Sequence, residues 1–227
     1  MLNGVGGGRR VAAFFDVDGT LISVQSVRLY IGYLHRHGLL SLADRLAMVW
    51  AYLNYRLGFL NKRKLARYSA RWISGREERV VRQQCRDWYA SEIKSYLCGP
   101  VVECVREHLR AGHVVVLLSG GTRYLNDLIA ADLGVEHVVG TDLEVVDGRF
   151  TGRTVGPLCY AAGKLAKAER FAAAHDIELD QSYFYTDSFS DIPTLERVGH
   201  PRIVNPDPRL RLEAGKRCWT MVEVARG

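Results

Sequence analysis

The sequence predicts an α/β fold with a doubly wound parallel sheet and an inserted block of helices. Two short apolar runs, VAAFFD (residues 11–16) and HVVVLL (residues 113–118), end abruptly in polar residues. Such runs are typical of strands buried on both faces. Helical segments separate these runs, and strands that alternate with helices favour a parallel sheet.

The composition is that of an ordinary globular protein. The chain has 227 residues, of which 48% are hydrophobic and 25% charged, which argues against extensive disorder. This length suits one core with an inserted subdomain, or two small domains. The formal net charge of +6 suits anionic ligands such as phosphate esters, nucleic acid or acidic lipid, and it selects none of them.

The cysteines predict a reduced, cytoplasmic protein in which they serve as packing residues. They are scattered, odd in number and form no CxxC pair: Cys85, Cys98, Cys104, Cys159 and Cys218.

Two segments of the N-terminal half are candidates for membrane or targeting segments, and neither has the required composition. Residues 1–10 (MLNGVGGGRR) lack the apolar stretch that a signal peptide requires, and we expect a disordered leader there. The most hydrophobic long stretch, residues 39–60, contains Asp44, Arg45 and Arg56, so no membrane-spanning helix is expected.

A helical block separates the first two strands. From about Val24 to Leu97 there is no proline, and apolar residues recur at helical spacing. Breaks at residues 58–62 and 74–75 divide the block into three or four helices. We interpret residues 23–97 as a helical cap inserted into a core made of residues 11–22 and 98–227. We expect one stripe to pack inside a helical bundle: Leu39, Leu42, Leu46, Val49, Leu53 and Leu57.

The second half alternates helices and strands. We expect helices at about 99–109, 122–133 and 162–175, with Thr122 as a cap and Gly134 as a stop. Residues 142–154 alternate around Asp147-Gly148 and predict a hairpin with a mainly structural role. Strands are expected at 182–186 and, as the final strand, near 202–205.

Polar residues follow the predicted strands at one rim. The first strand leads to Asp16-Val17-Asp18-Gly19-Thr20, the second to Ser119-Gly120, and a later one to the segment 187–191 (DSFSD); Lys164 begins a helix. In open α/β sheets, ligands bind at the carboxyl ends of the strands. The sequence therefore predicts that four acids, a hydroxyl and a lysine converge there.

This set of groups suits phosphoryl transfer. Clustered carboxylates resist ionisation unless a cation lies among them, and magnesium prefers oxygen ligands. The ion and the lysine can stabilise a phosphoryl group in transfer. One carboxylate can act as nucleophile and another as general acid and base.

Four motifs resemble, in order, those of the haloacid dehalogenase-like (HAD) superfamily: FFDVDGTLI, LLSGGT, AGKLAKAE and YTDSFSDIPTL. The last motif and the helical insertion are similar to subfamily IB, which contains phosphoserine phosphatase. The resemblance covers about residues 11–205. It implies a Rossmann-like core with a helical cap of the C1 type.

The resemblance also implies roles for the residues of these motifs. Asp16 would be the nucleophile and a metal ligand, and Asp18 the general acid and base, with its backbone carbonyl on the metal. Lys164 would neutralise Asp16 and the phosphoryl group. Asp187 would ligate Mg²⁺ directly, and Asp191 would hold its waters or Lys164.

The phosphate-binding set completes this assignment. Ser119 and the amide of Gly120 would bind the phosphoryl oxygens, together with Gly19 and Thr20. The acid at Asp18 favours phosphoester hydrolysis, since dehalogenases of the superfamily lack it. Lys167 is the alternative to Lys164, and each motif residue has a simpler alternative as a turn or helix-cap residue.

The cap says little about the substrate. Serine-specific relatives carry an acidic residue nine positions after the nucleophile, where this chain has neutral Gln25, which weakens phosphoserine as the substrate. Candidate substrate residues are Gln25, Arg28 and Arg71, with Arg67 as a further cation. Arg67 and Arg71 have a simpler alternative, which is that they lie on a solvent-exposed helix face.

We therefore expect a Mg²⁺-dependent phosphomonoesterase that acts on a small phosphorylated metabolite through phosphoaspartate. A phosphotransferase or phosphomutase on the same core is the alternative, followed by a non-catalytic phosphate-binding protein. A lipid-phosphate substrate is less favoured, because core packing explains the aromatic, basic helices. Nucleic acid is not an expected partner, and the oligomeric state is not determined by the sequence.

Overall fold

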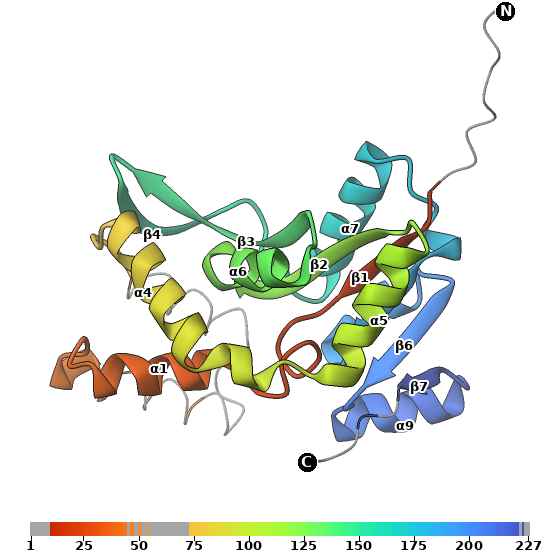
Figure 1. Ribbon diagram of the computed structural model, residues 1–227, viewed down its shortest axis with the longest axis horizontal. Helices are drawn as coiled ribbons and strands as arrows, with labels where there is room; N and C mark the ends of the chain where they lie inside the picture. The colour runs from red at the N-terminus through yellow and green to blue at the C-terminus, as the bar shows by residue number, and fades with distance from the viewer. Residues whose placement is uncertain are drawn as a thin grey trace, which may run out of the picture.

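Seven strands form one sheet in the part of the chain that the structure describes, with β1 at its centre (Figure 1). The computed structural model describes residues 10–44, 46, 47, 50, 54, 73–222 and 224. The strand order is β4-β3-β2-β1-β5-β6-β7, and every neighbouring pair is parallel except β3 and β4. The strands are β1 (Ala12–Phe15), β2 (Val114–Thr122), β3 (His137–Val146), β4 (Arg149–Val155), β5 (Tyr183–Thr186), β6 (His200–Val204) and β7 (Thr220–Val222).

Helices cover both faces of this sheet. Along β1, Ala13 and Phe15 pack in a cluster with α5 and α6, whereas Ala12 and Phe14 pack with α7, α8 and α9. All four residues are fully buried, which is why this strand reads as an unbroken apolar run. The helices are α1 (Ser26–Arg36), α4 (Glu78–Ser91), α5 (Gly99–Arg110), α6 (Arg123–Leu133), α7 (Ala162–Ala174), α8 (Ile192–Leu195) and α9 (Pro208–Lys216).

The predicted fold class is confirmed, and most predicted elements lie within a few residues of their expected bounds. The hairpin β3–β4 turns at Asp147 and Gly148, both with positive φ, as a tight hairpin turn requires. Helix α6 ends at Gly134 in the left-handed conformation. Thr122 occupies the N-cap position of α6, but its side chain makes no capping hydrogen bond.

Two elements near the C-terminus were not predicted. Residues 202–205 were expected to form the final strand, but β7 follows β6 and extends the sheet by one strand at its edge. Helix α9 lies between them. A three-residue edge strand is too short for a periodic pattern, and Pro208 and Gly215 obscure the helix. Strand β2 also continues to Thr122 instead of ending near Leu118.

The two ends of the helical insertion lie side by side. The N–H of Ser23 donates to the carbonyl oxygen of Tyr96 (3.0 Å), and that of Cys98 donates to Leu21 (2.9 Å). Ile22 and Leu97 form an antiparallel bridge. The chain therefore leaves and re-enters the core at one place. The division into core and cap stays a prediction.

The tip of the hairpin β3–β4 is attached to the start of α4 (Figure 1). Backbone hydrogen bonds join Gly75 to Phe150 (2.8 Å) and Glu78 to Gly148 (2.8 Å). Arg149 adds an ion pair with Glu77 (2.8 Å). This half of the predicted cap is thus bound to the core sheet by regular backbone pairing.

The predicted apolar stripe of the cap is wrong where the structure describes it. Leu42 and Leu46 are 67% and 63% exposed, and Leu39 is exposed as well. Val49, Leu53 and Leu57 lie outside the described residues. A helical period shows which residues share a face, but it does not show what that face packs against.

The prediction that the cysteines are packing residues holds for three of them and is wrong for Cys218. Cys85, Cys98 and Cys159 are buried, as expected for packing residues, but Cys218 is exposed, since it follows α9 at the surface. Within the described residues, no helix combines the length and the apolar character needed to cross a bilayer.

A polar aromatic cluster is buried beneath the amino ends of β2 and β5. His108 of α5 lies with its Nδ1 2.7 Å from Nδ1 of His113 and its Nε2 2.9 Å from the hydroxyl of Tyr185. Burial, with His113 and Arg202 nearby, lowers the pKa of His108 to about 4. The folded protein thus favours the neutral imidazole.

This pKa predicts a loss of stability in mild acid. In the unfolded chain the imidazole titrates near its ordinary pKa of about 6.5, so below that pH the unfolded state binds more protons and the free energy of unfolding falls down to about pH 4. We expect His108→Gln to reduce this fall, because glutamine does not titrate. Urea unfolding at about pH 7.5 and about pH 5 measures it, with exposed His35→Gln as the control. An equal loss in all three proteins would contradict the prediction.

Candidate active site

Asp16 lies at the carboxyl end of the central strand. Its N–H donates to the carbonyl oxygen of Tyr185 on β5 (2.9 Å), and its Oδ1 accepts from the N–H of Val17 (2.8 Å). Only 7% of the residue is exposed. The sheet and its own turn therefore orient this carboxylate.

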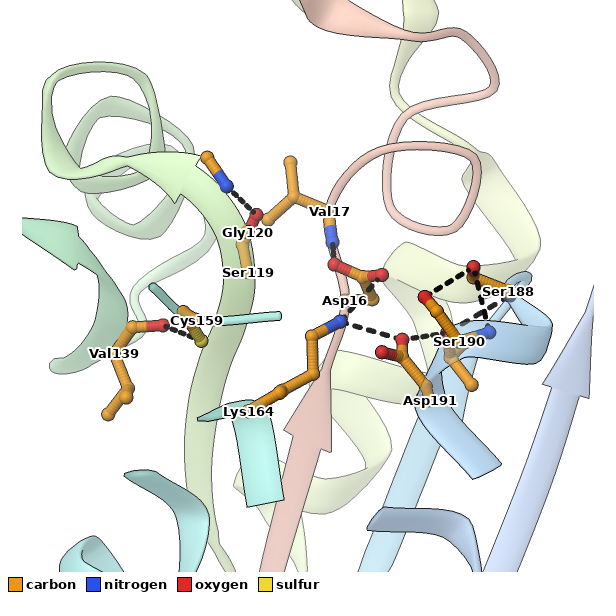
Figure 2. A network of polar contacts seen from close by, with 12 residues as sticks. Asp16, Val17, Ser119, Gly120, Val139, Cys159, Lys164, Ser188, Ser190 and Asp191 are labelled. Carbon is orange, nitrogen blue, oxygen red and sulfur yellow. Dashed lines mark hydrogen bonds and ion pairs between the residues drawn. The ribbon is translucent and has the colours of Figure 1, made fainter. Parts of the chain in front are cut away.

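Lys164 is buried between two carboxylates. Its Nζ lies 2.9 Å from Oδ2 of Asp16 and 2.7 Å from Oδ2 of Asp191 (Figure 2). The lysine comes from the first turn of α7 and is almost fully buried. Lys167, one turn later, donates instead to the carbonyl oxygen of Gly140 (2.6 Å). Of the two candidate lysines, Lys164 is the one in contact with Asp16.

The pKa values of Lys164 and Asp16 both lie above their ordinary values, for different reasons. Burial by itself would lower the pKa of Lys164, but the carboxylates of Asp16 and Asp191 outweigh it and raise the pKa above its ordinary value. Burial raises the pKa of Asp16 to about 6, although Lys164 opposes the shift. Two buried carboxylates share one ammonium group, so a further cation would stabilise both of them.

One carboxylate oxygen of Asp191 lacks a hydrogen-bond donor among the described residues. Its Oδ2 accepts from Lys164 and from the hydroxyl of Thr186 (both 2.7 Å). Its Oδ1 is buried and has no hydrogen-bond partner among the described residues. An unpaired buried acceptor costs about 1–3 kcal/mol, and a water on a bound ion would satisfy it. Asp191 therefore fits the expected role of holding metal-bound water.

Asp187 lies against the first loop. A Cβ atom on Gly19 would be only 2.2 Å from Oδ2 of Asp187, and Gly19 has a φ of +76°. Both the close approach and the backbone conformation require glycine here. The motif glycine thus brings the carboxylate of Asp187 next to the loop that follows Asp16.

The described residues do not form a metal site from side chains alone. No group of three His, Cys, Asp or Glu side chains in that part of the chain is arranged to hold a metal ion. Magnesium commonly keeps several waters and needs only one or two protein carboxylates. The carboxylates present fit such an ion, provided that water and a backbone carbonyl complete its coordination.

Asp18 points toward the insertion. Its Oδ1 accepts from the N–H of Ser26 (2.7 Å), the first residue of α1. A carboxylate at a helix N-terminus is stabilised by the free amide groups and the helix dipole. The predicted general acid and base is therefore hydrogen-bonded to the first helix of the predicted cap.

The predicted phosphate-binding residues differ in their surroundings. Ser119 is buried within the last part of β2, where its Oγ accepts from the N–H of Gly121 (3.1 Å), and exposed Gly120 follows it (Figure 2). The amides of Gly19 and Thr20 already donate to backbone carbonyls (both 3.2 Å). The hydroxyl of Thr20 is fully buried without a partner in the described part of the chain. Their phosphate-binding roles stay predictions.

Two of the candidate substrate residues of the cap lie within the described part of the chain. Gln25 directly precedes α1 and Arg28 lies in its first turn; both are exposed. Arg71 and Arg67 lie outside the described residues. Substrate contacts by these residues stay predictions.

A cavity of about 380 Å³ opens between α4, α6 and β3. Thr141 lines it and donates from its hydroxyl to the carbonyl oxygen of Gly120 (3.1 Å), so the cavity adjoins the predicted phosphate loop. Three carboxylates and two guanidinium groups face it. The lining residues are Glu78, Arg82, Arg123, Tyr124, Asp127, Thr141, Asp142 and Leu143.

Sequence reasoning missed two threonines that support the site. Thr186 binds Asp191 and also accepts from the N–H of Ser188 (3.2 Å). Thr141 accepts from the N–H of Cys159 (3.2 Å) while it donates to Gly120. The position of Thr186 directly before Asp187 was the available signal. For Thr141 the sequence offers none, because its partners are about 20 residues away on either side.

We expect Lys164→Met to destabilise the protein strongly. Removing one partner of a buried ion pair leaves uncompensated charge and costs about 3–5 kcal/mol. Urea unfolding without added divalent cations measures this loss. The control is Lys94→Met, whose pair with Asp132 is exposed and whose loss should cost about 1 kcal/mol or less. Similar losses in the two variants would contradict the expected role of the buried lysine.

Comparison with known proteins gives a family match over most of the chain. The model of the haloacid dehalogenase-like hydrolase family matches residues 13–196. The phosphoserine phosphatase SerB1 of Mycobacterium tuberculosis is 34% identical over 213 residues, which cover 92% of this chain and 69% of the relative. The histidinol-phosphatase of Neisseria meningitidis is 27% identical over 215 residues, covering 92% and 97%.

A solved structure has a similar fold. A protein of unknown function from Bordetella pertussis superposes with a TM-score of 0.89 at 29% identity, covering 95% of this chain and 99% of that one. The predicted resemblance is therefore confirmed. The chain belongs to the haloacid dehalogenase-like hydrolase family and is a phosphatase of that family.

Proposed function

We propose that this phosphatase hydrolyses a small phosphate monoester through a phosphoaspartate on Asp16, with Mg²⁺ as its cofactor. The buried contact of Lys164 with Asp16 and Asp191 at the end of the central strand carries this proposal. It provides an oriented carboxylate beside a fixed positive charge. A carboxylate so placed can act as nucleophile toward phosphorus.

In the first step, an oxygen of Asp16 forms a bond to phosphorus while the bond to the leaving oxygen breaks. Asp18 gives its proton to that leaving oxygen. In the second step, Asp18 takes a proton from water, whose oxygen attacks phosphorus and releases phosphate from Asp16. Lys164 balances negative charge on the phosphoryl oxygens throughout, and Ser119 with Gly120 orients them.

Asp16, Asp187 and the backbone carbonyl of Asp18 would hold the metal ion, and Asp191 would bind its waters. When bound, the ion supplies positive charge that stabilises the transferring phosphoryl group. The buried Oδ1 of Asp191, which has no partner among the residues that the structure describes, and the approach of Asp187 to Gly19 support this arrangement.

The cavity beside Gly120 suits the remainder of the substrate. Each of its carboxylates has a cationic partner: Glu78 pairs with Arg82 (2.6 Å), Asp142 with Lys167 (3.4 Å) and Asp127 with Arg123 (3.5 Å). The pair of Asp127 is the longest of the three, so this carboxylate can also accept hydrogen bonds from a substrate amine. The named substrates of the two sequence relatives, phosphoserine and histidinol phosphate, both contain amino groups. We therefore propose a phosphorylated amine or amino alcohol.

Substitutions of the two acids test the mechanism. We expect Asp16→Asn to abolish Mg²⁺-dependent hydrolysis of p-nitrophenyl phosphate. Asp18→Asn should lower kcat by about 10²–10⁴-fold, the usual contribution of general acid–base catalysis, while Mg²⁺ binding and folding persist. Steady-state kinetics and calorimetric Mg²⁺ titration measure both. Near-normal kcat in either variant would exclude the assigned role.

Two further results separate the alternatives. Beryllium fluoride with Mg²⁺ should raise the melting temperature of the parent protein, because it mimics the phosphoaspartate, and should not do so in Asp16→Asn. Stoichiometric release of free phosphate would exclude a phosphotransferase or phosphomutase. Phosphate binding without turnover would indicate the non-catalytic alternative.

The cavity predicts a substrate-dependent effect of Asp127. We expect Asp127→Asn to raise KM for phosphorylated amines about tenfold, as the loss of one charged hydrogen bond would, and to leave KM for p-nitrophenyl phosphate unchanged. Phosphate release from phosphoserine, histidinol phosphate, phosphoethanolamine and sugar phosphates provides the comparison. Asp132→Asn, whose carboxylate binds Lys94 and Tyr89 instead, is the matched control. A preference for sugar phosphates would contradict this substrate class.

A further inference from the structure

Asp207 joins the start of α9 to the loop between β5 and α8. It lies in the sequence Asn205-Pro206-Asp207-Pro208, directly after β6. Each proline fixes its own φ near −65°, so the backbone on both sides of Asp207 is restricted. Its side chain is therefore held at a defined place at the carboxyl edge of the sheet.

One oxygen of this carboxylate caps the helix. Oδ1 of Asp207 accepts from the N–H groups of Arg209 and Leu210, both at 2.9 Å. This is the usual role of an N-cap residue, and asparagine or serine fill it nearly as well as aspartate.

The rest of the residue binds the neighbouring loop. Oδ2 of Asp207 accepts from the N–H of Phe189 (2.7 Å), and the N–H of Asp207 donates to the carbonyl oxygen of Asp187 (2.9 Å). The loop is thus held at two points, on either side of Ser188. A cap alone explains neither contact.

This loop carries both acids that the proposed function places at the metal. Asp187 and Asp191 are its first and last residues. Within it, the N–H of Asp191 donates to the carbonyl oxygen of Ser188 (3.0 Å), and Thr186 binds the side chain of Asp191. Lys164 of α7 holds Asp191, the last residue of the loop. Asp207 holds the first part of the loop and attaches it to α9, whose Leu210 and Ala214 are buried in the core.

We propose that Asp207 is a positioning residue for Mg²⁺: it fixes the backbone of the 187–191 loop so that Asp187 meets the ion in the correct place. The inference rests on the metal site of the proposed function. It adds a residue outside the four motifs, about 20 positions after the first acid of the loop.

Asp207→Asn separates positioning from capping. The remaining carbonyl oxygen of asparagine can still cap α9, but its amide group then faces the N–H of Phe189, so two donors meet. We expect the Kd for Mg²⁺ to rise about tenfold, the effect of losing one charged hydrogen bond. Isothermal titration of the full chain with MgCl₂ measures it. The rate at saturating Mg²⁺ should return close to that of the parent.

Asp207→Ala and Ala214→Gly complete the experiment. Asp207→Ala removes the cap and the side-chain contact with Phe189 but keeps the backbone bond to Asp187, and it should also weaken Mg²⁺ binding. Ala214→Gly weakens α9 away from the loop; it should lower the melting temperature without changing the Kd for Mg²⁺. Unchanged Mg²⁺ affinity in both Asp207 variants would overturn the positioning role alone. A parent protein that binds no Mg²⁺ would overturn both this inference and the proposed metal site.

Discussion

The contact of buried Lys164 with Asp16 and Asp191 constrains much of the structure around it. Each buried ion loses several kcal/mol of hydration, and only close, well-oriented partners compensate for this loss. The end of β1, the first turn of α7 and the turn after β5 must therefore meet at one point. Parallel pairing of β1 with β5 aligns two of them, and packing of α7 on the same sheet brings the third.

Short polar links hold the loops around this contact, in addition to the apolar packing of Val17, Leu21 and Ile22. Thr186 fixes Asp191, Asp207 fixes the loop that contains it, and Gly19 leaves room for Asp187. The contacts of Asp207 and of Gly19 join segments that are distant in the chain, whereas Thr186 and Asp191 are only five residues apart. A catalytic arrangement that depends on such links is rigid at its base, which suits a site that must place a nucleophile and charge with precision.

The helical insertion contacts the core through α1 and through α4. Its first helix, α1, binds Asp18 through one amide, whereas α4 is paired with the hairpin β3–β4 along several residues. The cavity proposed for the substrate lies on the α4 side, next to Gly120. Substrate recognition and acid–base chemistry are thus assigned to two separate contacts between the insertion and the core.

The sequence by itself determined the fold class, most elements and the motif residues, because apolar runs, turn residues and charged loop ends are local patterns. It also favoured Lys164 over Lys167, because of the Gly-Lys step at the helix start, and the tertiary structure shows the contact of Lys164 with Asp16. The exposure of Leu42 and Leu46, the short strand β7, and the roles of Thr141 and Asp207 depend on contacts between distant segments. Local periodicity does not encode such contacts, because burial and hydrogen bonding are decided by what the rest of the chain places opposite each residue.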